Sequence, residues 1–468
     1  METIYSWEMT ALDLNCEYFG LSRIQLMENA GKSIADEIKK RFNKGKVTIF
    51  VGSGNNGGDG LVAARFLKGF DVKIVLAKEV KSDLALKNLK ILEEAKFNIL
   101  KWDEYSDKSD KEDIIVDALL GTGFKGKLRR PYDEIVDYIN DSDAFVVSVD
   151  VPSGLNADTG EFEKAVKADV TVTFHKVKPG LLISREIVGD IVVADIGIPE
   201  YFEKLSGPGD FKVVYKRKDR GHKGDHGKIL VVGGSPYVGA PFLAAKAAYA
   251  AGADWVTLAV PEKIFDYVAS FSPEVIPVKL KGDEISEDNI DEIIQLSKRH
   301  DVVVFGMGTV DKGDIAEELS KHVEKIVLDA GGITTKVHCK AILTPHGGEF
   351  RKHFGLEPTE ENLINVAKEI NATILLKGAE DLISDGRRLK VNKTGNAGMT
   401  VAGTGDVLAG VTAALFALND DPFWVASAAA FINGYAGDMC LEEKGFNYTS
   451  TDLIEKIPYA VKKVMELK

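Results

Sequence analysis

Short runs of β-branched and other apolar residues alternate along the chain with longer stretches that mix apolar and charged residues. A run that is apolar at successive positions fits a strand of a parallel sheet, because helices cover such a sheet on both faces. The alternation of such strands with amphipathic helices predicts an α/β fold. In the first half we expect strands at 47–52, 72–77, 114–119, 145–150, 170–174 and 191–197, and helices at 22–42 and 81–96.

The same alternation resumes after residues 200–227, which combine Gly and Pro with a dense mixture of Lys, Arg, Asp and His. This composition is typical of a connection between domains, and we place the boundary near residue 210. The expected domains are therefore 1–210 and 211–468. In the second domain we expect strands at 228–234, 255–260, 302–308, 326–332 and 373–378, and helices at 404–417 and 421–440.

Length and charge narrow the class of protein. A chain of 468 residues is too long for one hydrophobic core. Its net charge of −13 argues against nucleic-acid and membrane-surface partners, which attract basic surfaces. No apolar run approaches the ~18 residues of a membrane span, and residues 1–15 lack the pattern of a secretion signal. Because Cys16, Cys339 and Cys440 lie far apart, they indicate neither disulfides nor zinc. We expect a cytoplasmic enzyme.

A glycine-rich segment, 52-GSGNNG-57, follows the first predicted strand and formally matches the dinucleotide pattern G-x-G-x-x-G. A pyrophosphate at a helix N-terminus is bound by backbone N–H groups and the positive end of the helix dipole. Asp59 places a carboxylate about one turn from that position, while Asn55 and Asn56 offer amides suited to hydroxyls, carboxamides or a monovalent cation. The alternative is a simple strand-to-helix turn with Asp59 favoured in the first helical turn.

Two acidic residues, Asp117 and Asp150, end later strands of the first half. Open α/β sheets bind ligands at the carboxyl ends of their strands. Asp150 is therefore a candidate general acid or base, although an Asp that caps a turn is the alternative. Asp117 and Ser153 supply oxygens that would hold a cation with Asn56 if the three residues converge. The loop after Asp117 carries cations suited to phosphate, namely Lys125, Lys127, Arg129 and Arg130.

A second glycine-rich turn, 403-GTGD-406, opens a predicted helix in the second half. Its backbone N–H groups form an anion hole, and Asp406 stands where it can take a proton from an attacking hydroxyl. A positioned base beside an anion hole is the minimum requirement for phosphoryl transfer. Segment 377–381 is placed to line a nucleotide, and His346 lies on a Pro/Gly loop, which favours a binding role over an idle exposed side chain. Segment 222–235 predicts only a loop near the nucleotide.

Taken in order, these motifs resemble the family of fused NAD(P)H-hydrate epimerases and dehydratases, over nearly the whole chain. The motifs that carry the resemblance in the first half are 26-LMENAG-31, 52-GSGNNGGDG-60, 121-GTGFKGK-127 and 149-VDVPSGLNADTG-160. Those in the second half are 222-HKGDHGKILVVGGS-235, 344-TPHGGEF-350, 377-KGAED-381 and 396-NAGMTVAGTGDVLAG-410. One departure is Gly347, where relatives more often have Pro before the second Gly of the loop.

The resemblance implies a Rossmann-like three-layer sandwich with epimerase activity in the first half. Asp150 would be its catalytic residue. The hydrated cofactor (NADHX or NADPHX) would contact Asn55, Asn56, Gly57, Gly58, Asp59, Gly121, Thr122, Gly123, Phe124, Lys125, Gly126, Lys127 and Asp150. A potassium ion would be held by Asn56, Asp117 and Ser153.

The resemblance also implies a ribokinase-like second half that dehydrates the S hydrate with ADP, accompanied by Mg²⁺. Asp406 would be its catalytic base. The hydrate would contact Ala253, Gly308, His346, Gly347, Gly348, Glu349, Phe350 and Asp406. ADP would contact Lys377, Gly378, Ala379, Glu380, Asp381, Asn396, Ala397, Gly398, Met399, Thr400, Ala402, Gly403, Thr404 and Gly405.

Two other functions stay open at this point. One is a small-molecule kinase, for example of a vitamin precursor, fused to an unrelated Rossmann-like binder, because the GTGD turn suits it equally. The acidic residues of the first half argue against it. The other is a non-catalytic interaction module in the first half, as in some RNA-processing scaffolds, against which Asp117, Asp150 and Ser153 argue. We expect small-molecule substrates, no nucleic acid, no membrane, and a homo-oligomer; the choice between NADHX and NADPHX stays open.

Overall fold

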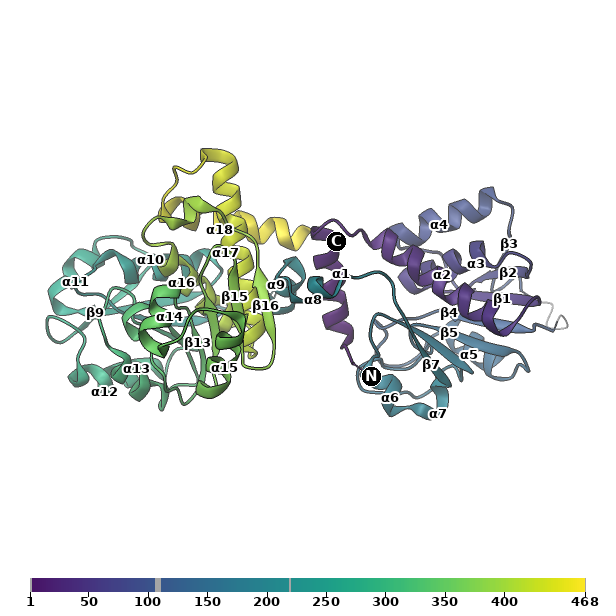
Figure 1. The fold of residues 1–468 in the computed structure, drawn as a ribbon, viewed down its shortest axis with the longest axis horizontal. Coiled ribbons are helices and arrows are strands. Elements are labelled where there is room, and N and C mark those ends of the chain that lie inside the picture. Colours follow the sequence, from purple (N-terminus) through teal and green to yellow (C-terminus); the bar gives the residue numbers. More distant parts are fainter. Residues whose placement is uncertain (1, 106–110, 219, 468) are drawn as a thin grey trace. The chain divides into compact units, whose positions relative to one another are not determined.

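The chain forms two compact units, Met1–Pro199 and Glu200–Lys468, each built on a largely parallel sheet with helices on both faces (Figure 1). The computed structural model describes residues 2–105, 111–218 and 220–467. The predicted α/β fold is confirmed in both units. Among the described residues, no helix is long and apolar enough to cross a membrane.

The first unit contains a seven-stranded parallel sheet in the order β3-β2-β1-β4-β5-β6-β7. The strand order reverses between β1 and β4, and doubly wound sheets bind ligands outside the carboxyl ends of strands at such a point. The strands are β1 (Lys46–Val51), β2 (Asp71–Leu76), β3 (Asn98–Lys101), β4 (Ile114–Ala118), β5 (Phe145–Val149), β6 (Val170–Phe174) and β7 (Asp190–Ala194). The helices are α1 (Ser6–Tyr18), α2 (Arg23–Arg41), α3 (Asn55–Phe66), α4 (Asp83–Glu94), α5 (Tyr132–Asn140), α6 (Pro179–Ile183) and α7 (Arg185–Val188).

The second unit contains a nine-stranded sheet in the order β10-β9-β8-β11-β12-β13-β14-β15-β16. Its strands are parallel as far as β14, and β15 and β16 then pair antiparallel at one edge. The strands are β8 (Lys228–Val232), β9 (Trp255–Pro261), β10 (Ile276–Leu280), β11 (Val302–Phe305), β12 (Lys325–Leu328), β13 (Lys340–Leu343), β14 (Thr373–Leu376), β15 (Asp381–Ser384) and β16 (Leu389–Asn392).

Helices cover both faces of this sheet (Figure 1). These helices are α8 (Glu200–Lys204), α9 (Pro208–Val214), α10 (Gly239–Ala250), α11 (Glu262–Ala269), α12 (Ile290–Ser297), α13 (Gly313–Ser320), α14 (Gly347–Phe354), α15 (Glu360–Ile370), α16 (Thr404–Phe416), α17 (Pro422–Lys444) and α18 (Ser450–Glu466). Short 3₁₀ turns lie at Glu287–Asn289, Ala330–Gly332 and Ala397–Thr400. Helices α16 and α17 are buried almost throughout, as a central helix pair requires.

The segment that joins the two units belongs to the second one. The boundary that we expected near residue 210 falls inside α9, which packs against α17. Asp210 is fully buried there, and Lys390 Nζ lies 2.8 and 3.0 Å from its two carboxylate oxygens. Ser427 Oγ donates a further hydrogen bond to Asp210 at 2.9 Å. Because this ion pair is buried and hydrogen-bonded, α9 is an integral part of the second unit.

We therefore expect fragments 1–199 and 200–468 each to fold, whereas a fragment 211–468 is destabilised. Loss of Asp210 leaves the Lys390 ammonium buried without its carboxylate, which costs about 3–5 kcal/mol of unfolding free energy. Chemical denaturation of fragments 200–468 and 211–468 measures the difference. A Lys390→Met change in the shorter fragment, which removes the unpaired charge, should restore part of the loss. Equal stability of the two fragments contradicts the assignment of α9 to this unit.

Candidate active sites in the two units

Asp117, Ser153 and Asn56 gather at the strand-order reversal of the first unit. Asp117 ends β4 fully buried, and Ser153 Oγ and Ser153 N donate to its two oxygens at 2.5 and 2.8 Å. Burial raises the pKa of Asp117, although its hydrogen bonds from Ser153 and Ser148 oppose the rise. Asn56 lies against the loop that follows, because a Cβ on Gly121 would come within 3.1 Å of Asn56 Oδ1.

These three side chains provide the oxygens that a monovalent cation needs. The Nδ2 atom of Asn56 is buried and has no hydrogen-bond partner. Rotating that amide by half a turn would put Oδ1 in its place, and such a rotation is an ordinary ambiguity of amide assignment. The set therefore fits a singly charged cation. Within the described residues, no cluster of three or more His, Cys, Asp or Glu side chains is arranged to hold a metal ion.

Asp150 is held by a lysine that the sequence did not single out. It follows β5 with a φ of 64°, a conformation that is uncommon outside glycine and that clusters at functional sites. Its Oδ1 accepts hydrogen bonds from Lys178 Nζ at 2.5 Å and from Thr173 Oγ1 at 3.1 Å. The Lys178 side chain is 0% exposed, so its charge is compensated chiefly by Asp150. Lys178 follows β6, and the strand-end rule that selected Asp150 also applies to it.

Two further carboxyl groups share this environment. Burial raises the pKa of Asp59 well above its ordinary range, and the nearby Asp150 and Asp13 carboxylates raise it further. Burial likewise raises the pKa of Asp13, on α1, to about 7. Sequence reasoning missed Asp13 because it predicted no helix before residue 22. The first unit thus combines the ion-paired carboxylate of Asp150 with two buried carboxyl groups whose pKa values are raised.

The loop after β4 borders this centre with exposed cations. Lys125 and Lys127 are exposed, and Lys127 Nζ pairs with Glu163 at 2.8 Å in an ion pair that is open to solvent. Exposed pairs of this kind are weak, so Lys127 is free to exchange Glu163 for an anionic ligand. Thr122, Gly123, Phe124 and Gly126 belong to the same turn, with Phe124 N bonded to Gly121 O.

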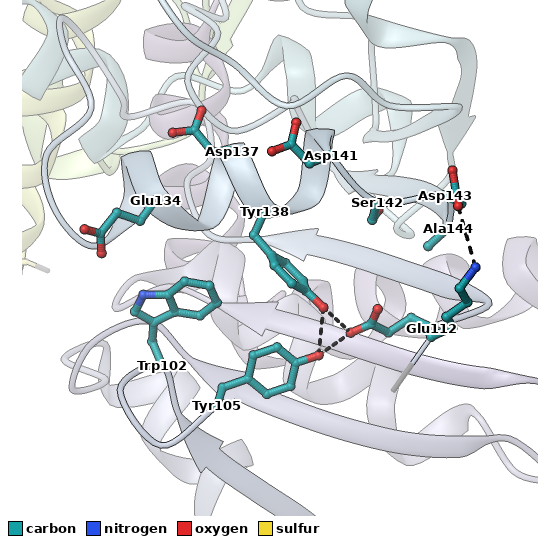
Figure 2. Close-up of a pocket in the computed structure, with 11 residues that line it drawn as sticks. Trp102, Tyr105, Glu112, Glu134, Asp137, Tyr138, Asp141, Ser142, Asp143 and Ala144 are labelled. Atoms are coloured by element: carbon teal, nitrogen blue, oxygen red, sulfur yellow. Dashed lines mark hydrogen bonds and ion pairs between the residues drawn. The ribbon is translucent and has the colours of Figure 1, made fainter. Parts of the chain in front are cut away.

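A different hollow of the first unit, of about 810 Å³, contains none of the predicted residues (Figure 2). Trp102, Tyr105 and Tyr138 line it, and both tyrosine hydroxyls donate to Glu112 Oε1. The three rings also pack around Phe50, which is fully buried. We therefore interpret this hollow as the edge of an aromatic core cluster.

In the second unit, Asp406 lies in the first turn of α16 beside two charged groups. Burial raises the pKa of Asp406 to about 7, the Asp329 carboxylate raises it further, and Lys377 opposes the rise. Burial disfavours the charge of Lys377, but the carboxylates around it outweigh that effect and raise its pKa. Lys377 Nζ donates to Asp329 Oδ1 at 2.8 Å. A carboxylate that titrates near neutral pH is suited to act as a general base.

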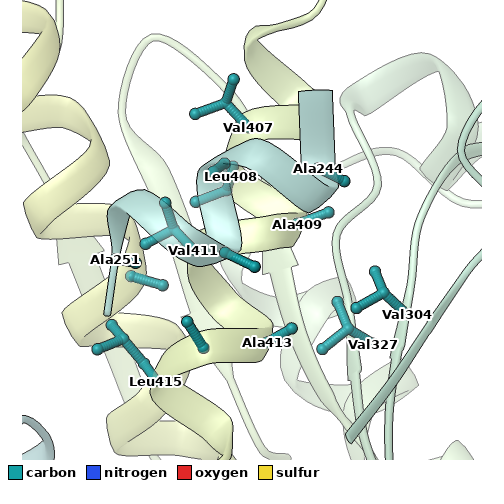
Figure 3. Close-up of a cluster of buried hydrophobic side chains, with 14 of the residues drawn as sticks. Ala244, Ala251, Val304, Val327, Val407, Leu408, Ala409, Val411, Ala413 and Leu415 are labelled. Atoms are coloured by element: carbon teal, nitrogen blue, oxygen red, sulfur yellow. The ribbon is translucent and has the colours of Figure 1, made fainter. Parts of the chain in front are cut away.

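The start of α16 is held in place by close helix packing. Figure 3 shows Ala244 of α10 and Ala251, which follows that helix, near Val407, Leu408 and Val411 of α16. A Cβ on Gly410 would come within 2.1 Å of Ala244 O, so only glycine lets the two helices approach this closely. The turn before α16 needs a glycine too, because Gly403 has a φ of 97°. Rigid packing of α16 fixes the position of Asp406.

Most of the predicted nucleotide contacts line one cavity of about 410 Å³. The predicted residues that line it are Lys377, Gly378, Ala379, Asp381, Asn396, Ala397, Met399, Thr400, Thr404 and Gly405. The sequence missed others: Thr394, Gly395, Leu408, Asn433 and Gly434. Gly398 lines a neighbouring hollow, and Glu380 points to Lys393 at 3.5 Å. Asp329 was missed as well, although it ends its strand as Asp117 does.

The loop that carries His346 reaches the same end of the sheet. His346 caps α14, its Nδ1 accepting from Gly348 N at 2.9 Å and from Glu349 N at 3.2 Å. Lys377 N donates to Pro345 O at 2.8 Å, which places this loop beside Lys377. Gly308 is another of the predicted hydrate contacts. Its φ of 73° favours glycine, and a Cβ at this position would come within 2.4 Å of Tyr237 O, so the chain approaches closely here.

Three expectations about the second site are wrong. Phe350 is fully buried and packs on Phe354 in the core, so it faces away from any ligand. Ala253 precedes β9 and therefore lies at the amino end of the parallel strands, whereas the site lies at their carboxyl ends. Segment 222–235, expected as a loop near the nucleotide, is not one loop. Residues 222–227 precede β8 and lie at the amino end, where His226 N and Nδ1 bond to Asp254 Oδ2. Residues 228–232 form β8, and only residues 233–235 lie at the carboxyl end.

Comparison with known proteins identifies the family of each half of the chain. The family "YjeF-related protein N-terminus" matches residues 23–180, and the family "NAD(P)H-hydrate dehydratase" matches residues 229–459. The chain is 56% identical to the bifunctional NAD(P)H-hydrate repair enzyme Nnr of Archaeoglobus fulgidus, over 98% of this chain and 99% of the relative. The chain belongs to the family of bifunctional NAD(P)H-hydrate repair enzymes. The predicted family membership is confirmed.

Other members and structures are consistent with this. The repair enzyme Nnr of Methanothermobacter thermautotrophicus is 42% identical over 96% of this chain and 94% of its own. The structure of an ADP/ATP-dependent NAD(P)H-hydrate dehydratase from Bacillus subtilis, co-crystallised with ATP and Mg²⁺, matches 56% of this chain and 98% of its own, with a TM-score of 0.50 at 21% identity. That likeness shows the fold of the dehydratase half.

Proposed function

We propose that this repair enzyme interconverts the R and S hydrates of NADH and NADPH in its first unit and dehydrates the S hydrate with ADP in its second. The observation that carries the proposal is one chain holding two different centres, the Asp150–Lys178 pair and the Asp406 cavity. Its relatives share both halves over their full length. A single-activity kinase would need only the Asp406 cavity.

The second centre is suited to activating a poor leaving group. Hydration leaves a hydroxyl at C6 of the nicotinamide ring, and hydroxide departs with difficulty. Asp406 takes the proton of that hydroxyl as its oxygen attacks the terminal phosphate of ADP, which yields AMP and a phosphorylated hydrate. Phosphate then leaves with loss of a ring proton, regenerating the reduced ring. The N–H groups of residues 403–405 at the start of α16 stabilise the phosphate charge.

Lys377 and Asp329 support this step. Lys377 lies beside the same turn, since a Cβ on Gly405 would come within 3.1 Å of its Nζ. Its ammonium is oriented by Asp329 and offers a charge-assisted hydrogen bond to phosphate. Mg²⁺ bound with ADP would neutralise phosphate charge, and the carboxylates of Asp329 and Glu349 are oxygen ligands of the kind it prefers.

The first centre supplies an acid and a base. In the route that we propose, the hydroxyl leaves C6 as water and water returns from the other face of the ring. Burial raises the pKa of Asp59, which favours its protonated form as the donor to the leaving hydroxyl. Asp150, hydrogen-bonded by Lys178, is placed to accept a proton from the returning water.

A potassium ion, coordinated by Asn56, Asp117 and Ser153, would offset the buried negative charge of Asp117 and order the loop that follows it. Lys125 and Lys127 would then meet the phosphates of the hydrate. We further propose that the enzyme is a homo-oligomer and works in the cytoplasm on small molecules alone.

Mixing the protein with R and S hydrates, with and without ADP, tests the proposal through the absorbance of the reduced nicotinamide. With ADP we expect both hydrates to be converted completely, the R form after epimerisation; without ADP we expect none to be converted. The control is fragment 200–468, which should consume only the S hydrate. Consumption of both hydrates by that fragment at similar rates rules out the division of labour.

A further inference from the structure

The polar side chains that line the nucleotide cavity are mostly engaged within the protein. Thr394 Oγ1 donates to Asn392 Oδ1 at 2.8 Å. Asn396 uses both ends of its amide, donating to Asp438 at 3.0 Å and accepting from Tyr448 Oη at 2.8 Å. These contacts build a rigid wall but leave those groups little capacity for a ligand.

Asn433 differs from its neighbours in this wall. It lies on α17, lines the cavity and is only 4% exposed. Its Oδ1 atom is buried and has no hydrogen-bond partner. Buried polar atoms in native proteins are nearly always hydrogen-bonded, so an unpaired carbonyl in a cavity wall indicates that a ligand supplies the donor.

Asn433 and the glycine-rich turn enter the cavity from different helices, α17 and α16. The proposed function places the phosphates at the start of α16, beside Gly405 and Lys377. Asn433 lies next to Gly434, where a Cβ would come within 2.4 Å of Thr394 Oγ1, so α17 and the Thr394 loop meet closely. With the diphosphate at the turn, we place the base against the wall that Asn433 and the Thr394 loop form.

We propose that Asn433 Oδ1 accepts a hydrogen bond from the 6-amino group of an adenine base and thereby selects ADP over other purine diphosphates. This inference rests on the proposed function in one respect: that a nucleotide binds in this cavity. Adenine carries an amino donor next to ring-nitrogen acceptors, and the asparagine carboxamide complements that pair of groups. Hypoxanthine carries a carbonyl at the same position and would face the Asn433 oxygen with a second acceptor.

Calorimetric titration without hydrate tests this with three ligands: ADP, inosine diphosphate, and purine riboside diphosphate, which lacks the amino group. We expect the natural protein to bind both analogues at least about tenfold more weakly than ADP, since an analogue without the donor leaves a buried acceptor unpaired. Asn433→Leu should weaken ADP binding and bring the affinities for ADP and purine riboside diphosphate to within about twofold of each other. Asn433→Asp, which keeps an acceptor, should retain the preference for ADP.

The exposed Asn365 on α15 provides a matched control, because Asn365→Leu makes the same chemical change away from the cavity. It should leave all three affinities unchanged. Equal affinities of the natural protein for ADP and purine riboside diphosphate, or unchanged discrimination in Asn433→Leu, overturn the inference. The titrations contain no hydrate, so they measure nucleotide binding alone. If the repair assay fails, the titrations still test the role of Asn433. If the titrations fail, the repair assay still tests the proposed function.

Discussion

Replacing Asp406 by Asn is expected to lower the rate of ADP-dependent dehydration of the S hydrate by about 100-fold or more. Asn has the shape of Asp but cannot take the proton of the C6 hydroxyl. ADP binding should persist, because the backbone N–H groups of the turn and Lys377 remain. Single-turnover assays with S hydrate measure the rate, and titration with ADP measures binding.

The pH dependence of the natural enzyme provides the matching control. Burial and Asp329 raise the pKa of Asp406 to about 7, and the base must be unprotonated to act. The dehydration rate should therefore fall as the pH drops through about 7 and level off above it. In Asp406→Asn this inflection should disappear. Dehydration at nearly the natural rate in that variant removes Asp406 from the mechanism.

Replacing Asp150 by Ala is expected to abolish interconversion of the R and S hydrates, while ADP-dependent dehydration of the S hydrate continues. In the proposed function, Asp150 moves the proton in the first unit, and dehydration takes place in the second unit without it. The measurement is consumption of pure R hydrate in the presence of ADP. An Asp150→Ala enzyme that clears R hydrate faster than spontaneous epimerisation excludes Asp150 as the catalyst.

Asp150→Ala is also expected to lower the stability of the first unit, and the experiment has to distinguish this loss of stability from a loss of catalysis. Removing Asp150 leaves the Lys178 ammonium buried without its partner, which destabilises a fold by about 3–5 kcal/mol. The double variant Asp150→Ala/Lys178→Met removes both charges and should recover much of that stability without recovering epimerisation. Thermal unfolding of the first unit, measured beside the activity, distinguishes lost chemistry from lost structure.

Local features of the sequence were enough to predict the fold class and the outline of both sites. Runs of apolar residues mark the central strands. The carboxylates Asp117 and Asp150 stand where two of these strands end, and Asp406 stands at the start of a helix after a glycine-rich turn. Strands β3 and β15 were not predicted, because each has only two apolar residues between polar ones. The equally short β11 was predicted, because all four of its residues are apolar. Ala253 and Phe350 were misplaced because a motif does not indicate which end of a strand, or which face of a helix, a residue occupies.

Only the tertiary structure decided what these groups can do. Lys178, Asp13, Asp329 and Asn433 come from segments far from the motifs, and the fold brings them to the sites. The raised pKa values of Asp13 and Asp406 come first from burial, which packing between distant segments produces. The sequence also does not show that Asn433 Oδ1 is buried without a hydrogen-bond partner, because that depends on which side chains the fold places around it. Residue types and their spacing can be read from a short segment. The burial of a side chain and its hydrogen-bond and ion-pair partners depend on how the whole chain folds.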